Sequence, residues 1–563
     1  MRAAALLVMF AWSASGADQW LRVTTPHFEL YTDAGEKAGR DAILHFEQVR
    51  DFFQKASPVH SNEDFPVRIL AFNGRDQFLP YSPNAQAIAY YAPGARRDFI
   101  VMSDLSADSY KVAIHEYMHL VVRHSGLRIP VWLNEGWADV YSTLKPAKDG
   151  VAVGDLIPGR VQVLSQGPWL DFDTLTSVGV GSPIYNEGNR TGLFYGESWA
   201  LVHMLFLAPD YKDNFGKFLM ALHRGSSAAE ACETAYGKPA AAVFLDLRKY
   251  FERKRLFGAV YATTLTKAES EPAVARASTF EARLVLADLL ASIGRSDLAR
   301  QEYDQLEKLE PGQADLEQSL GFLALAHSDK AAARQHFSRS FAAGGGDPQM
   351  CVALATLETA AQQSPLQVIP ILERALQAKP DYAEALLQLG GLRVVTRQYE
   401  GAISALMSIK IVTPDRAPGV FFSLAYAYLE TGDLARAREN ALTAQKWAKT
   451  PQQTQELTRM LAFIEARQKL PSPPRPGEKL QSVEGVLQGM DCSPKGNHLL
   501  VHAGQQDLVF ALPDFKAVEF FTNRSGPLNL QCGPQNPLPV VVQYAPVSVM
   551  DIGAAGVVRR IDY

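Results

Sequence analysis

The pattern of hydrophobic and polar positions changes character along the chain. Up to about residue 250, short apolar runs such as HFELYT (27–32) and VRILAF (67–72) predict strands. The polar stretch 36–55 between them has the spacing of a helix. Two further apolar runs, AIAYYA and RDFIVMS, lie before and after Pro93 and Gly94, an arrangement that predicts a hairpin. We therefore expect an α+β fold in this first part.

From about residue 280 the periodicity is helical, and small residues return at intervals near 34. These residues are Ala299, Ala333, Ala402 and Ala437. A fixed period of this length indicates stacked repeats, and Gly294, Tyr303 and Pro311 occupy other expected positions in the first copy. The segment 280–450 thus resembles tetratricopeptide repeats. The resemblance implies five helical hairpins stacked into a right-handed superhelix, with a face that binds proteins or extended peptides.

The last part of the chain follows a proline-rich linker, PSPPRPGE, at 471–478. Beyond it, short apolar runs such as NHLLVHA, DLVFAL and LPVVVQY are separated by Gly, Pro and Asn. This pattern predicts a small β sandwich or barrel over 479–563, without a catalytic constellation. Cys492 and Cys532 both lie in it, either joined by one disulfide or present as two buried thiols.

The first twenty residues place one Arg before an apolar run that ends in small residues. This is the pattern of a signal peptide over 1–17, so we expect export to a periplasmic or extracellular location. An anchoring helix is the weaker interpretation, because the apolar run of about ten residues is short of the ~20 that a span needs. No later segment predicts a transmembrane helix. The net charge of -5 and the absence of a basic cluster argue against nucleic acid as a partner.

The apolar stretch VAIHEYMHLVV at 112–122 contains three residues that a buried helix disfavours, His115, Glu116 and His119. Residues four apart lie one above the other on a helix, so both imidazoles face the same point. Two such imidazoles begin a tetrahedral zinc site, which needs a third protein ligand and leaves one position for water. The pattern therefore predicts that Zn²⁺ is the cofactor.

The missing ligand is predicted in LNEGWADVYS, sixteen residues after His119, where Glu135 and Asp139 lie one helical turn apart. Glu135 is the candidate third metal ligand. Asp139 would accept the N–H of a liganded histidine and fix its tautomer. Glu116 would then act as the general base that takes a proton from the metal-bound water. Buried histidines with a purely structural role would leave these acidic residues unexplained.

These motifs resemble those of the gluzincins, the clan of thermolysin and the zinc aminopeptidases, and most of all its peptidase-MA-like members. The resemblance covers about residues 18–250 and implies a zincin-like peptidase fold with His115, His119 and Glu135 as the zinc ligands. It also implies a role for Tyr195, in FYGESWALVHML, as a donor to the oxyanion. The segment that connects the two motifs is shorter than in thermolysin.

The sequence as a whole predicts a multidomain, exported zinc metallopeptidase. An endopeptidase is favoured over an aminopeptidase, because AIAYYAPG lacks the acidic residue that grips a substrate amine. The alternative is a catalytically degenerate scaffold that acts through its repeats. The predicted segments are a signal peptide (1–17), a zincin-like domain (18–255), a tetratricopeptide-repeat domain (270–470), a linker (471–478) and a small β domain (479–563).

Overall fold

The computed structural model describes residues 20–58, 66–94, 96–148, 150–186, 189–253, 256–469, 478–493, 496–512, 515–522, 528–547 and 553–563. The predicted signal peptide at 1–17 and all but the last residue of the predicted linker lie outside the described residues. The chain divides into two compact units, Met1–Gly345 and Gly346–Tyr563. Each unit is described by itself.

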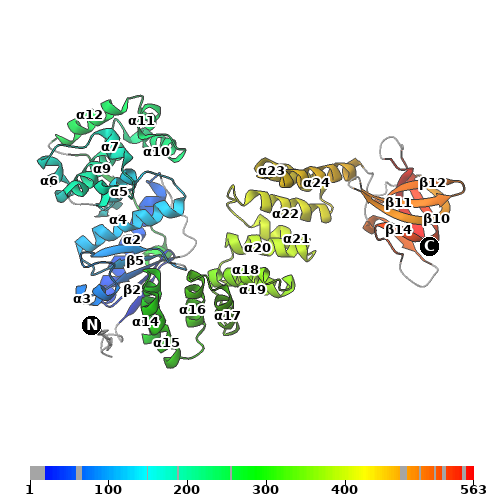
Figure 1. Cartoon of the computed structure of the whole chain (residues 1–563), viewed down its shortest axis with the longest axis horizontal. Coiled ribbons are helices and arrows are strands. Elements are labelled where there is room, and N and C mark those ends of the chain that lie inside the picture. The colour runs from blue at the N-terminus through cyan, green and yellow to red at the C-terminus, as the bar shows by residue number, and fades with distance from the viewer. Residues whose placement is uncertain are drawn as a thin grey trace, which may run out of the picture. The chain divides into compact units, whose positions relative to one another are not determined.

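The first unit is built on a six-stranded sheet with the order β4-β5-β3-β2-β1-β9 (Figure 1). The strands are β1 (Leu21–Thr24), β2 (Phe28–Thr32), β3 (Val67–Ala71), β4 (Ala89–Ala92), β5 (Phe99–Met102) and β9 (Ala273–Arg276). The central strands β2, β3 and β5 are parallel, and β4 forms the predicted antiparallel hairpin with β5. Because β5 lies inside the sheet, β4 is the strand of this hairpin that has an open edge.

Successive residues of the central strands face opposite sides of the sheet, and both sides are buried. Ile69 and Ile100 pack with the helices α2 (Glu36–Lys55) and α4 (Ala107–Ser125) on one face. Their neighbours Leu70 and Val101 pack on the other face against α14 (Thr279–Ser292), the first helix of the repeats. The strands are therefore apolar throughout, as expected for a sheet covered on both sides.

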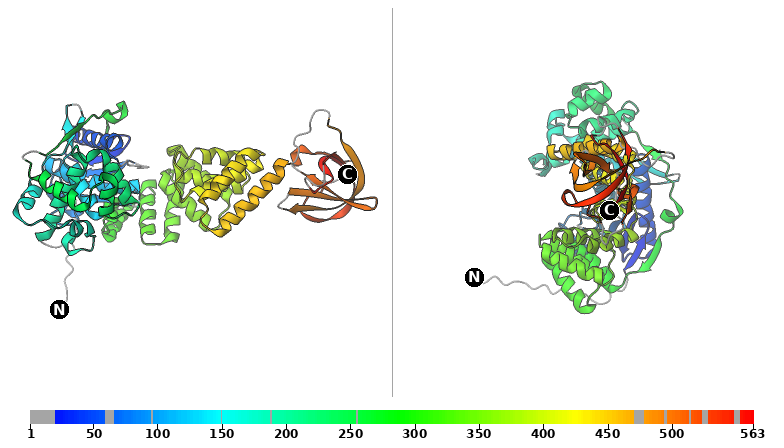
Figure 2. Two further views of the ribbon diagram at one scale, coloured as in Figure 1. Left: turned by 90° about the horizontal axis from the view of Figure 1, so that it is seen from above. Right: turned by 90° about the vertical axis from the view of Figure 1, so that its right-hand side faces the viewer.

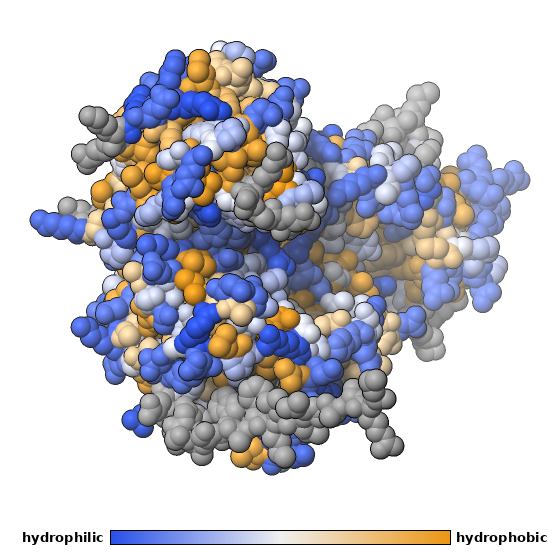
Figure 3. Space-filling view, turned by 60° about the vertical axis from the view of Figure 1, so that its left-hand side comes forward, coloured by the Kyte–Doolittle hydropathy of each residue, from blue (hydrophilic) through white to orange (hydrophobic). Residues whose placement is uncertain are grey.

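A second lobe of the first unit consists of helices that follow α4 (Figure 1). They are α5 (Val131–Tyr141), α6 (Pro158–Gln166), α7 (Phe172–Ser177), α8 (Pro183–Asn186), α9 (Asn189–Leu207), α10 (Phe215–His223), α11 (Ala228–Tyr236) and α12 (Ala240–Phe251). A small sheet joins β6 (Lys145–Ala147), β7 (Gly150–Val153) and β8 (Ala259–Tyr261). Short helices α3 (Arg75–Phe78) and α13 (Lys267–Ser270) complete the unit up to the repeats. The surface is hollowed between this lobe and the sheet below it (Figure 3).

Helix α5 packs closely against α9 because of a glycine in the NEGWAD motif. A Cβ atom on Gly136 would lie 2.2 Å from the backbone oxygen of Ser198, so no larger residue fits there. The two tryptophans of α5, Trp132 and Trp137, are fully buried in the core. The packing fixes which face of α5 points toward α4.

Helix pairs begin within the first unit and continue in the second. The first unit contains α14 with α15 (Ser296–Leu309), and α16 (Ala314–Ala326) with α17 (Lys330–Ala342). The second unit contains α18 (Pro348–Ala360) with α19 (Pro365–Ala378), α20 (Ala383–Val395) with α21 (Tyr399–Met407), α22 (Ala417–Glu430) with α23 (Leu434–Trp447), and then α24 (Pro451–Lys469).

The small residues of the repeats lie where two helices approach. The four alanines predicted from the period, Ala299, Ala333, Ala402 and Ala437, are all fully buried. A Cβ on Gly321 would lie 2.3 Å from the ring of Phe337 in the paired helix. The structure confirms five tetratricopeptide-like helical hairpins. Among the described residues, no helix combines the length and apolarity that a membrane span needs.

The second unit ends in a β domain, which the sequence predicted as a sandwich or barrel (Figure 2). Its strands are β10 (Gln481–Ser493), β11 (Gly496–Ala503), β12 (Gln506–Leu512), β13 (Glu519–Phe521), β14 (Gly533–Pro546) and β15 (Gly556–Asp562). The order is β12-β11-β10-β14-β15-β13, and an additional pairing between β12 and β15 closes the sheet into a barrel. Cys492 and Cys532 are joined by a disulfide.

Candidate metal centre

Helix α4 presents His115 and His119 to α5. The helix begins at a serine cap, where the Ser106 hydroxyl accepts from the Ser109 N–H, and it ends at Gly126, whose φ of 71° suits a glycine. One face of the helix is buried in the core with the sheet, and the two imidazoles lie four residues apart on another face. Their side chains are 16% and 19% exposed, so solvent reaches them.

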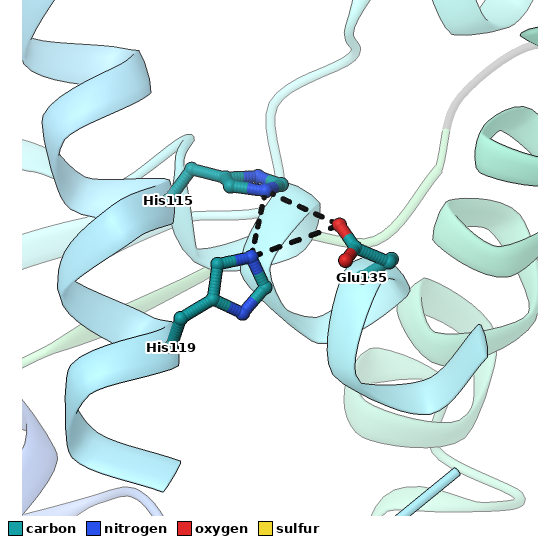
Figure 4. Close-up of side chains that lie close together, drawn as sticks. All are labelled: His115, His119 and Glu135. Carbon is teal, nitrogen blue, oxygen red and sulfur yellow. Dashed lines mark hydrogen bonds and ion pairs between the residues drawn. The ribbon is translucent and has the colours of Figure 1, made fainter. Parts of the chain in front are cut away.

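Glu135 on α5 completes a cluster with the two histidines, and the three side chains point toward one another (Figure 4). The Nε2 atoms of His115 and His119 are 3.1 Å apart. Oε2 of Glu135 lies 3.4 Å from Nε2 of His115 and 3.7 Å from Nε2 of His119. The structure thus brings together the three residues that the sequence predicted as metal ligands.

These separations fit a zinc ion. Ligands at about 2.0–2.1 Å in a tetrahedron are about 3.3 Å from one another. The three donor–donor distances of 3.1, 3.4 and 3.7 Å scatter around that value. Two imidazoles and one carboxylate are also the ligand set of catalytic zinc sites, in which a fourth position stays open. The residues present therefore fit the predicted ion.

Asp139 supports His115 from the far side of its ring. Oδ1 of Asp139 lies 3.1 Å from Nδ1 of His115, and its Oδ2 accepts a hydrogen bond of 2.7 Å from Nε of Arg160. Because a carboxylate can only accept, the hydrogen resides on Nδ1, and Nε2 points into the cluster. The structure therefore places Asp139 where the sequence predicted it, and adds Arg160, which the sequence did not single out.

The surroundings of the cluster are negatively charged. Burial lowers the pKa of His115, but hydrogen bonds to Asp139 and Glu135 outweigh it and raise the pKa to about 10. Burial raises the pKa of Glu135, but the hydrogen bond from His115, the charges of His119 and His115 and the hydrogen bond from Tyr185 together outweigh it, so this pKa lies below its ordinary value. A site that holds a proton this strongly also favours a divalent cation.

The side chain of Glu116 extends from α4 to the edge strand of the sheet. Its Oε2 accepts a hydrogen bond of 3.3 Å from the backbone N–H of Tyr91 in β4. This N–H points away from β5, toward the open edge of the sheet. The carboxylate that the sequence predicted as general base is therefore held beside the strand that can pair with an extended chain.

The tyrosine that contacts the cluster is Tyr185, in α8. Its hydroxyl donates a hydrogen bond of 3.0 Å to Oε1 of Glu135. The sequence-predicted Tyr195, in α9, stacks on Tyr185 with ring centres 6.1 Å apart, and the guanidinium of Arg160 lies 4.7 Å from its ring centre. Burial, followed by the charge of Glu135, raises the pKa of Tyr195, so its hydroxyl keeps its proton and can donate. Tyr195 lies next to the cluster, and Tyr185 links the two.

No protein-family model matches the sequence, and no curated protein matches it. Among solved structures, one similar protein is YrrB, described as a TPR (tetratricopeptide-repeat) protein with an unusual peptide-binding site. It is 20% identical, and the match covers 31% of this chain and 90% of YrrB with a TM-score of 0.28.

Two further similar structures match a similar share of this chain. MamA is 18% identical over 31% of this chain and 98% of its own, with a TM-score of 0.25. TTC0263, a thermophilic TPR protein of Thermus thermophilus, is 20% identical over 32% of this chain and 98% of its own, with a TM-score of 0.21. Similarity of this kind concerns the helical repeats and leaves the metal centre untested.

Proposed function

We propose that the chain is a zinc-dependent peptidase whose helical repeats bind protein partners or substrates. The observation that carries the proposal is the cluster of His115, His119 and Glu135, whose donor atoms have the separations of a tetrahedral zinc site. Two contacts support the proposal: Asp139 lies 3.1 Å from Nδ1 of His115, and Glu116, the next residue after His115 on α4, accepts a hydrogen bond from the N–H of Tyr91. The peptidase half of the proposal rests on this geometry.

His115, His119 and Glu135 would hold the zinc ion, with Asp139 orienting the first of them. Bound zinc would supply a water of lowered pKa and would polarise the carbonyl of the scissile bond. Glu116 would take a proton from that water and pass it to the leaving amine. Its hydrogen bond from the N–H of Tyr91 keeps the carboxylate beside the open edge of β4.

An oxyanion is stabilised by a hydrogen-bond donor, and the hydroxyls of Tyr185 and Tyr195 are candidates for this donor. Tyr185 already donates to Glu135, so its proton is engaged in the cluster. Tyr195 stacks beside it, and its hydroxyl keeps its proton and is hydrogen-bonded to Tyr185; turned toward a substrate, it would be the donor that stabilises the oxyanion. Tyr185 would then position Glu135.

The open edge of β4 would bind the substrate by adding a strand to the sheet. The pairing of β4 with β5 leaves alternate N–H and C=O groups, including the N–H of Tyr91, facing outward. The residues of β4, AYYA, include no acidic side chain that would hold the free amine of a substrate, which favours endopeptidase activity. We include in this proposal that the first unit has a zincin-like fold.

We also propose that the protein is exported. The disulfide between Cys492 and Cys532 supports this location, because disulfides persist in the periplasm and outside the cell and are rare in the cytosol. The two other cysteines, Cys232 and Cys351, are buried free thiols.

A second candidate is a scaffold that acts through its repeats, with a peptidase domain that no longer hydrolyses peptides. The five helical hairpins favour this reading, since stacked repeats of this kind present an extended concave surface to proteins. Two of the similar structures reported above are TPR proteins, so the comparisons agree better with this candidate than with the peptidase.

The two candidates differ in what Glu116→Gln does. For the peptidase, the wild type binds one zinc ion and cleaves casein or a peptide library, and Glu116→Gln keeps the zinc but loses cleavage. Glu36→Gln, at the exposed start of α2, is the matched control and should cleave like the wild type. Zinc bound by all three proteins with cleavage by none would support the scaffold. A folded wild type that binds no zinc would refute the metal centre itself.

A further inference from the structure

A pocket of about 210 Å³ lies in the first unit between the β4–β5 hairpin and the helices α14, α15 and α16. None of the residues that line it belongs to the metal cluster. On the sheet side it is lined by Arg68 of β3, by the hairpin and by Phe99 of β5. The pocket is thus formed jointly by the sheet and the first repeats, and the proposed peptidase reaction does not use it.

Three arginine side chains contribute to the lining of the pocket. Arg68, Arg96 and Arg97 supply three positive charges, and Asp288 in the lining and Glu29, which pairs with Arg68, supply two negative charges, so a net charge of +1 remains. Oδ1 of Asp288 accepts a hydrogen bond of 2.9 Å from the hydroxyl of Tyr303. The pocket therefore attracts anions.

Arg68 is the most telling of these residues because it is buried, with only 4% of its surface exposed. Its Nε and Nη2 each lie 2.8 Å from Oε2 of Glu29. Its Nη1 has no hydrogen-bond partner among the described residues, and the nearest ion-pair contact, to Oδ2 of Asp288, is 3.6 Å long. A buried N–H without an acceptor is costly, so an acceptor is expected from water or from a ligand.

The lining also contains apolar side chains. Phe99, Phe322, Leu323 and Pro93 line the pocket, together with small alanines of α14 and α16. A volume of about 210 Å³ is smaller than the ~300–1,000 Å³ of pockets for drug-sized ligands, and is suited to a group of about one amino-acid residue. The lining therefore combines an anion site with a small hydrophobic site.

We propose that this pocket binds the carboxylate of a small apolar group, such as the C-terminal residue of a peptide that ends in a hydrophobic side chain. Planar guanidinium groups match a carboxylate in two parallel hydrogen bonds, and Nη1 of Arg68 would supply one donor. The aromatic and aliphatic wall would take the side chain. Phosphate fits less well, because its polar oxygens would face that wall.

The pocket lies against the turn of the β4–β5 hairpin, so a ligand bound there would contact this hairpin. Pro93, Arg96 and Arg97 belong to the turn of the β4–β5 hairpin, and Tyr91 of the same hairpin donates to Glu116. A ligand in the pocket would therefore contact the hairpin that holds the proposed general base. The binding site itself does not depend on the peptidase proposal and is tested without any assay of cleavage.

The test is calorimetric titration of the full chain with N-acetyl-leucine and, in separate arms, with N-acetyl-leucinamide and octanoate. We expect N-acetyl-leucine to bind with a Kd of about 1 mM or tighter, the range open to a ligand of its size. The neutral amide should bind at least tenfold more weakly, because it lacks the charge. Tighter binding of octanoate than of N-acetyl-leucine would overturn the amino-acid-like ligand in favour of a fatty acid.

Two variants connect binding to this pocket. Arg97→Gln removes one positive charge, and Ala326→Trp places a bulky side chain from the exposed end of α16 at the lining. Each should weaken binding at least tenfold, whereas the matched controls Arg300→Gln on α15 and Ala331→Trp on α17 should bind like the wild type. Folding is checked by circular dichroism. Equal affinity for the acid and the amide, or unchanged affinity in folded Ala326→Trp, would refute the proposal.

Discussion

The contact between Asp139 and His115 predicts how strongly the cluster binds zinc. Asp139→Asn keeps the size of the side chain but removes the negative charge that lies 3.1 Å from Nδ1 of His115. A hydrogen bond to a charged group contributes about 1.5–3 kcal/mol, and Asp139 is only 5% exposed, so solvent cannot replace it. Since about 1.4 kcal/mol corresponds to a factor of ten, zinc should bind about 10- to 150-fold more weakly.

The assay is a competition between the metal-free protein and a chromophoric zinc chelator at neutral pH. Asp155→Asn is the matched control, because Asp155 is exposed and pairs with Lys145 on the surface. It should bind zinc like the wild type. Thermal unfolding shows whether Asp139→Asn remains folded, since the variant leaves Arg160 without its charged partner. A folded Asp139→Asn protein whose zinc affinity stays within twofold of the wild type would contradict the proposed support of His115.

Three further predictions concern single side chains and the disulfide. Burial raises the pKa of Glu197 from 4.5 to about 8, so the folded state holds a proton that the unfolded state releases, and stability falls as the pH rises between these values. In urea denaturation, Glu197→Gln should therefore be more stable at pH 7 by on the order of 3 kcal/mol and lose this gain near pH 4; a gain that does not change with pH would contradict the assignment. Tyr195→Phe should lower kcat about 100-fold with zinc binding unchanged, and an unchanged kcat would exclude it as the oxyanion donor. Replacing Cys492 and Cys532, which are 40 residues apart, by serine should destabilise the barrel by about 4 kcal/mol, measured by denaturation with and without reductant.

Local periodicity explains what the sequence could predict. The strands, the β4–β5 hairpin and the five helical hairpins follow from spacings within a few tens of residues. The cluster could be predicted for the same reason. His115 and His119 share one face of a helix, and Glu135 and Asp139 share one face of the following helix. The alanine period also located the helix contacts, because a small residue is required wherever two helices approach.

Contacts between segments that are far apart in the sequence could not be predicted from local periodicity. Tyr185 is 50 residues from Glu135 and lies in a segment without periodicity, so nothing local marks it as a partner. The choice between sandwich and barrel depends on the single pairing of β12 with β15, which strand patterns do not encode. The zinc ion, the catalytic role of Glu116 and export stay predictions, and the signal peptide lies outside the described residues.

The packing of α14 on the sheet sets where this protein can be divided. Leu70 and Val101 form one apolar cluster with Val285 and Leu289, and β9 joins the sheet from beyond residue 255. A fragment that stops before α14 would expose a hydrophobic surface and would be expected to aggregate. Engineers who wish to exchange the repeats should therefore cut after Gly345, where the first compact unit ends, and keep the first two hairpins as part of that unit.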